Sequence, residues 1–263
     1  MDTQSAPTVS RGRVLAYRII AGIFGVFIII SNLAFSVPQF FSATDKVHSF
    51  HDLASMPAFL VLLGFALIVM MLRPDDVVAL RVGWAVVLGT VVAGLLGHDF
   101  ISGTYYITLI VVGVLTILAP ARGELLRFGS PNIAMLSLAI VAAIPAIVFA
   151  WDNARIMLQG DPMHDATGHW KYHHWSGVAA SALGVVLAAI AVSFRSPGDR
   201  MWTWVVGFAT MLFGLAGIIF SDAVRYPSSI GTLWGVGVFF VGLVYIVVAE
   251  VSDPADADEV AAT

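Results

Sequence analysis

The sequence has no cysteine, and this absence excludes disulfide bonds, thiolate nucleophiles and thiolate metal ligands. Charged residues are also scarce, at 11% of the 263 residues, whereas hydrophobic residues make up 59%. A soluble domain usually carries about 25% charged residues. The chain also lacks a glycine-rich phosphate loop, a serine nucleophile elbow and an H-E-x-x-H motif, and nothing in it indicates a nucleic-acid partner. The mean hydropathy of +0.91 predicts an integral membrane protein. Because cysteine is absent, any metal ligands could only be His, Asp, Glu or Met.

Long apolar stretches fill most of the chain. A membrane-spanning helix needs about 20 mostly apolar residues, and such stretches occur at 15–36, 53–72, 78–97, 101–120, 132–150, 175–194, 202–221 and 230–249. The sequence therefore predicts an all-α integral membrane protein with eight transmembrane helices. Only the connections 37–51 and 151–174 are long. The polar segment 1–13 and the acidic tail 251–263 are expected to be disordered cytoplasmic ends.

Lysine and arginine are unevenly divided between the two sides that eight helices would define. If the chain starts in the cytoplasm, nine lie on that side and four on the other. The cytoplasmic set is Arg11, Arg13, Arg18, Arg73, Arg81, Arg122, Arg127, Arg195 and Arg200, and the outer set is Lys46, Arg155, Lys171 and Arg225. The positive-inside rule then places both termini in the cytoplasm and the protein in the cell membrane. Tryptophans are expected to form aromatic belts, with Trp151, Trp170 and Trp175 at the outer boundary and Trp202 and Trp204 at the inner one.

The sequence is similar to itself at an offset of 123 residues. The matching pairs include His51 with His174, Pro74 with Pro197, Asp76 with Asp199, Gly94 with Gly217, and Asp99 with Asp222. The pattern predicts two four-helix repeats, at 14–121 and 131–250. Because four is an even number, both repeats would insert in the same orientation, related by a pseudo-twofold axis along the membrane normal. Equivalent residues would lie at equal depth, where they could face each other or form two separate half-sites.

Histidines gather on one side of the predicted bundle. All seven fall on the outer side, and four of them lie within the stretch 164–174. Paired imidazoles with carboxylates can bind Zn, Fe or Cu. The duplicated residues are the preferred metal ligands: His51, His174, Asp99 and Asp222. Supplementary candidates are His48, His98, His169 and His173.

Each candidate also has a simpler interpretation. Histidine is common at membrane interfaces, where it is solvated, and an Asp between two helices can cap the second one. Arg225 could hold an anionic group of a substrate or form an ion pair with Asp222. Tyrosines and tryptophans near these positions are expected to belong to the aromatic belt.

The run from His164 to His174 reads H-x4-H followed by H-x3-H-H. It resembles the histidine boxes of membrane di-iron desaturases and hydroxylases over eleven residues. That family has three boxes on the cytoplasmic side. The other histidines here form only H-x2-H and the single His98, and the charge distribution places them outside.

Three classes of function remain open on sequence alone. The first is a metal-dependent membrane enzyme acting on a lipidic or small substrate. The second is a transporter or proton-coupled carrier, although the eight apolar stretches carry almost no ionisable residue near the midplane. The third is an accessory membrane subunit without a site. A bis-histidine haem, with His51 and His174 as axial ligands, is an alternative cofactor.

Overall fold

The protein is a bundle of long helices. The computed structural model describes residues 10–41, 46–99, 103–159, 173–194, 199–220 and 231–252. Within these ranges there is no strand, only one isolated bridge between Pro131 and Phe194. The helices are α1 (Arg11–Phe41), α2 (Lys46–Met56), η1 (Pro57–Gly64), α3 (Phe65–Leu72), α4 (Val77–Gly97), α5 (Gly103–Leu118), η2 (Arg122–Glu124), α6 (Ile133–Gln159), α8 (His174–Val192), α9 (Asp199–Ile219) and α10 (Gly231–Val251).

Seven helices are long and apolar enough to cross a membrane, which indicates a multi-pass membrane protein. One of them is the continuous span Ser49–Leu72, built from α2, η1 and α3. The eighth predicted span, 101–120, is not confirmed. It corresponds to α5, whose 16 residues reach about 24 Å at 1.5 Å per residue, less than the hydrocarbon thickness of about 30 Å.

Two helix boundaries differ from the sequence prediction. The helix α1 starts at Arg11 and reaches Phe41, so the first turn includes residues assigned to the disordered end 1–13. The helix α6 continues to Gln159, nine residues past the predicted end at 150. Polar residues after Trp151 made this segment resemble a connection, but Asn153 is fully buried there. Residues 1–9 and 253–263 lie outside the described residues.

The central span changes its helical geometry at a proline. Pro57 is the first residue of the π-helical segment η1, between α2 and α3. Because proline has no N–H and its ring displaces the preceding carbonyl, the regular ladder cannot continue through this residue. A π-helical segment accommodates the interruption within one continuous span.

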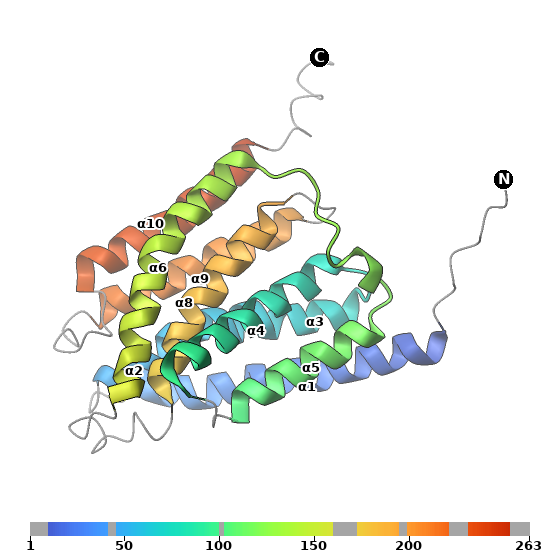
Figure 1. The fold of residues 1–263 in the computed structure, drawn as a ribbon, viewed down its shortest axis with the longest axis horizontal. Coiled ribbons are helices and arrows are strands. Elements are labelled where there is room, and N and C mark those ends of the chain that lie inside the picture. Colours follow the sequence, from blue (N-terminus) through green and yellow to red (C-terminus); the bar gives the residue numbers. More distant parts are fainter. Residues whose placement is uncertain are drawn as a thin grey trace, which may run out of the picture.

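The helices run up and down, so that chain ends and turns gather at two opposite ends of the bundle. The first turn of α1 and the last turn of α10 lie at the same end (Figure 1). Hydrogen bonds join several turns there, including Asn132 N to Ser193 O at 2.8 Å and Trp202 Nε1 to Asp76 Oδ2 at 3.4 Å. This end is called the basic end, because Arg13, Arg81, Arg122, Arg127 and Arg200 all lie in helices or turns that meet there.

Arginines at the basic end are bound by the backbone of the protein. Arg81 is 5% exposed, and its guanidinium donates hydrogen bonds to the carbonyls of Glu124, Leu125 and Arg127. Arg13 donates in the same way to the carbonyls of residues 117, 118 and 119 at 2.6–3.1 Å. Residues 117 and 118 lie in the last turn of α5 and residue 119 follows it, where the carbonyls of a helix lack intrahelical donors. The two arginines therefore fix the turn after α5 to α4 and α1.

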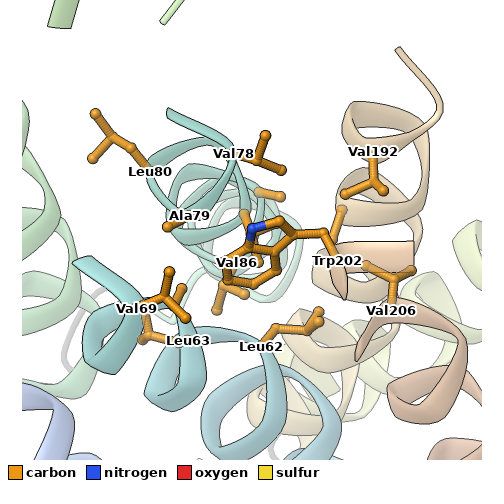
Figure 2. Close-up of a cluster of buried hydrophobic side chains, with 14 of the residues drawn as sticks. Leu62, Leu63, Val69, Val78, Ala79, Leu80, Val86, Val192, Trp202 and Val206 are labelled. Atoms are coloured by element: carbon orange, nitrogen blue, oxygen red, sulfur yellow. The ribbon is translucent and has the colours of Figure 1, made fainter. Parts of the chain in front are cut away.

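The core is apolar and closely packed around the crossing of α4 and α8. A Cβ on Gly89 would lie only 2.5 Å from the backbone N of Gly184, so the two helices approach at a position where only glycine fits. Trp202 of α9 is fully buried. Figure 2 shows its ring among Leu62, Val86, Val192 and Val206, which come from η1, α4, α8 and α9. This burial corrects the expectation that Trp202 belongs to an interfacial belt, whereas Trp204 is 52% exposed.

Candidate functional site

Four of the predicted site residues meet at the end of the bundle opposite the basic end. This end is called the histidine end, and the group is His51, Asp99, His173 and His174. His51 lies on α2, Asp99 follows α4, and the two other histidines begin α8. Figure 1 shows the start of α2, the last turn of α4 and the start of α8 close together there. Three segments that are distant in sequence thus supply one cluster.

Two turns of unusual backbone geometry position this cluster. His98 caps the end of α4 with φ 50° and ψ 30°, and the next residue, Asp99, donates its N–H to Gly94 O at 2.9 Å. His173 caps the start of α8 with φ 59°. Left-handed conformations are unfavourable for residues other than Gly, Asn and Asp. The two histidines therefore adopt a strained conformation that turns the chain sharply beside Asp99.

The rings of His51 and His174 are in contact. Their centroids are 5.8 Å apart and the ring planes meet at 75°. His51 is 2% exposed and His174 is half-buried. These are the two histidines that the predicted repeat pairs, and they are close neighbours although their sequence positions differ by 123.

Aromatic residues cover the buried side of this pair. The ring centroid of Trp175 lies 4.2 Å from that of His51, and the ring centroid of Phe50 lies 5.8 Å from that of His51. Trp175 is fully buried, which corrects the expectation that it belongs to the outer aromatic belt. Sequence position alone could not show this, because a Trp at a helix start looks the same whether it faces lipid or covers an imidazole.

Asp99 is paired with His173. The distance from His173 Nδ1 to Asp99 Oδ1 is 2.7 Å, and the side chains are 27% and 2% exposed, respectively. This contact occupies Nδ1 of the imidazole. It also leaves Nε2 as the nitrogen of His173 that could bind a ligand.

Polar groups of α6 and α8 lie next to the cluster. Asn153 donates its amide to Phe149 O at 2.8 Å, the same bond to the fourth preceding carbonyl that Asn32 makes to Ile28 O at 2.9 Å in α1. A Cβ at Gly97 would lie 3.4 Å from Ser176 Oγ, and Ser176 is fully buried. Sequence reasoning did not select Ser176, because a single Ser at a helix start carries no distinctive pattern.

The remaining predicted site residues do not join the cluster in the part of the chain that the structure describes. His98 caps α4 and is exposed. His169, Asp222 and Arg225 lie outside the described residues, and so does the side chain of His48. Of the two carboxylates that the predicted repeat pairs, Asp99 and Asp222, the structure therefore describes only Asp99.

The described residues bring two histidine rings into contact but do not form a metal site. Two imidazoles that bind one ion at 2.0–2.1 Å place their ring centres about 5–6.5 Å apart, and the His51–His174 separation of 5.8 Å falls in this interval. Among residues 10–41, 46–99, 103–159, 173–194, 199–220 and 231–252, no group of three or more His, Asp or Glu could hold a metal ion. A full set would need a ligand from the segments around Asp222 or His169.

Comparisons with known proteins do not narrow the function. No family model, no curated protein and no solved structure matches the chain. The chemistry of the histidine end is therefore the basis for the function proposed below.

Proposed function

We propose that the protein is a multi-pass cell-membrane metalloprotein with its metal site at the histidine end. The observation that carries this proposal is the contact between His51 and His174, at a separation that suits two ligands of one ion. Trp175 and Phe50 exclude water from one side of the pair, and His174 leaves the other side partly open. Sites that perform chemistry keep such an open position.

Asp99 and His173 would support the same site. We assign Asp99 the role of orienting His173, with Nε2 of that ring directed to the metal or to a bound water. Carboxylate–histidine pairs of this kind fix the ring orientation and raise the basicity of the ligand. Asp222, the equivalent of Asp99, is the proposed further ligand, and Arg225 the proposed contact for an anionic group of the substrate. A Zn, Fe or Cu ion held here would activate water or oxygen.

The proposed architecture is two parallel four-helix repeats, with α5 as the eighth membrane helix. The pattern of helix contacts supports it, because contacts in one half have counterparts in the other. The contact of α6 with α8 corresponds to that of α1 with the α2–η1–α3 span. In the same way, the contact of α9 with α10 corresponds to that of α4 with α5, and the contact of α6 with α10 corresponds to that of α1 with α5. Across the halves, α4 contacts α8, and α9 contacts α2 and η1. A twofold axis between the halves would bring His51 and His174 together, and their ring contact agrees with it.

The proposed orientation has both termini in the cytoplasm and the histidine end outside. Arginines of the described helices and turns mark the basic end, and cytoplasmic loops carry an excess of Lys and Arg. A transporter is the weaker alternative. In the described spans, Asp, Glu, Lys and Arg occur toward the ends of the helices, whereas ion translocation calls for such groups near the midplane.

Metal analysis of the purified protein tests the proposal. The wild type is compared with the double variant His51→Gln and His174→Gln, which keeps polar side chains of similar size, and with His98→Asn as a matched control. We expect near-stoichiometric metal in the wild type and the control, and its loss in a double variant that still elutes as a folded protein. Metal retained in the double variant, or absent from all three, would overturn the proposal and favour an accessory subunit.

A further inference from the structure

An apolar cavity of about 230 Å³ lies between α6, α8, α9 and α10. Its lining includes Pro145, Phe149, Ala182, Phe213, Trp234 and Gly237. The one hydroxyl in the lining, that of Thr210, is already bonded to Val206 O at 2.9 Å. The lining is otherwise apolar except for the indole N–H of Trp234.

The cavity is continuous with the core beneath the histidine pair. Phe149, Ala182 and Phe213 line it and belong to the same buried cluster as Phe50, which contacts the ring of His51. Ala182 comes eight residues after His174 on α8, which corresponds to about 12 Å along the helix axis. The cavity thus begins deeper in the bundle than the histidine end, along the same helix.

The mouth of the cavity faces hydrocarbon in a membrane-spanning bundle. Its lining includes Gly237, whose Cβ position has no atom within 4 Å, and Trp234, which is 38% exposed. Around it, Ile144 of α6 and Phe240 of α10 are 65% and 55% exposed. Only an apolar molecule in the bilayer can approach across such a rim.

Small residues keep the space open in the second half of the chain. Ala182 lines the cavity, whereas Phe59 stands 123 residues earlier at the corresponding position. Phe59 packs against the main core cluster. The two halves of the chain therefore differ at this position: the second half has a cavity beside Ala182, and the first half has the large side chain of Phe59.

We propose that this cavity binds a hydrocarbon chain of a lipidic substrate whose polar head lies at His51 and His174. The inference rests on the proposed function and adds the substrate class. Pockets for entire small molecules usually measure about 300–1,000 Å³, so a cavity of about 230 Å³ suits part of a chain. A chain entering from the bilayer replaces lipid contacts by protein contacts, while its head remains at the level of the interface.

Photo-crosslinking tests the position of the chain. The purified full-length protein is placed in phosphatidylcholine vesicles with a trace phospholipid that carries a diazirine in the middle of one acyl chain. Peptide mapping should place crosslinks on cavity residues such as Phe149, Phe213 and Val238. Gly237→Leu adds a side chain where a Cβ meets no atom within 4 Å and should lower these crosslinks about tenfold, a loss of about 1.4 kcal/mol.

Two comparisons make the result decisive. Gly113→Leu is the matched control, because Gly113 is also a helical glycine with no atom within 4 Å of its Cβ position, and it should leave the crosslinks unchanged. A second probe with the diazirine on the headgroup should label His173 and His174, which are partly exposed.

The proposal is overturned if the chain probe labels only outward-facing residues such as Ile147 and Phe240. It is also overturned if Gly237→Leu changes nothing, or if the headgroup probe labels Leu126 and Phe128 at the basic end instead. Metal content is measured on the same samples. A cavity that binds the chain in a protein without metal would refute the proposed function and retain the chain site.

Discussion

The two ends of the bundle use ionisable side chains in different ways. At the basic end, Arg81 and Arg13 are bonded to backbone carbonyls from the turn after α5. At the histidine end, ionisable side chains contact one another: His51 lies against His174, and His173 lies 2.7 Å from Asp99. Carbonyls that end a helix need donors, so the arginines complete the fold. Imidazoles in contact satisfy no such requirement, and this difference supports the proposal that the histidine end is the functional one.

The largest expected effect concerns which end faces which side of the membrane. Because the chain has no cysteine, a single introduced thiol reports its own surroundings. Leu158→Cys near the histidine end should react with a membrane-impermeant maleimide in intact cells. Leu126→Cys at the basic end, 83% exposed, should react only after the membrane is opened. The reverse pattern would contradict the proposed orientation.

The next largest effect is expected at the basic end. Arg81→Met removes the donor to three carbonyls and should lower the free energy of unfolding by about 3–5 kcal/mol, because buried partners lose their hydrogen bonds. Unfolding by denaturant in detergent measures it. The control is Arg127→Met, whose side chain is 75% exposed and pairs with Glu124, and which should change stability by about 1 kcal/mol or less. Equal effects of the two variants on the free energy of unfolding would show that the buried hydrogen bonds of Arg81 do not stabilise the fold.

Asp99→Asn is expected to lower stability less than Arg81→Met does and, in addition, to lower the affinity for metal. The substitution keeps the size of a nearly buried side chain but removes its charge beside His173. Unfolding should become easier by about 1–3 kcal/mol, and metal affinity should fall about 10–100-fold, as for other residues that orient a metal ligand. Stability and metal titration are measured on one preparation. Lost stability with unchanged affinity would leave Asp99 a structural role alone.

The smallest effect is expected from His98→Gly. His98 has φ 50°, a conformation that glycine adopts without strain, so the variant should be more stable by about 0.5–1 kcal/mol. Its metal content should equal that of the wild type, because His98 is exposed and outside the pair. A fall in metal content would instead make His98 a ligand and extend the site to the last turn of α4.

The length of the apolar stretches predicted most of the fold, whereas the positions of the His and Asp residues predicted less of the site. Apolar stretches located seven spans, because the cost of burying backbone in lipid requires about 20 apolar residues in a helix. The extension of α6 past Asn153 was not predicted, since its stability comes from a buried amide and not from hydropathy. The predicted repeat led to the expectation that His51 and His174 could face each other. It could not predict the pairing of Asp99 with His173, which depends on two left-handed residues at 98 and 173.

Titration of the metal-stripped protein with Co²⁺ tests the central claim most directly. If His51 and His174 bind one ion, the wild type should develop visible ligand-field absorption that saturates at about one ion per chain. His51→Gln and His174→Gln should each abolish this absorption, and the double variant should be no worse than either, because the two ligands act as a unit. Unchanged absorption and affinity in both single variants would contradict the claim, as would a wild type that never binds the ion.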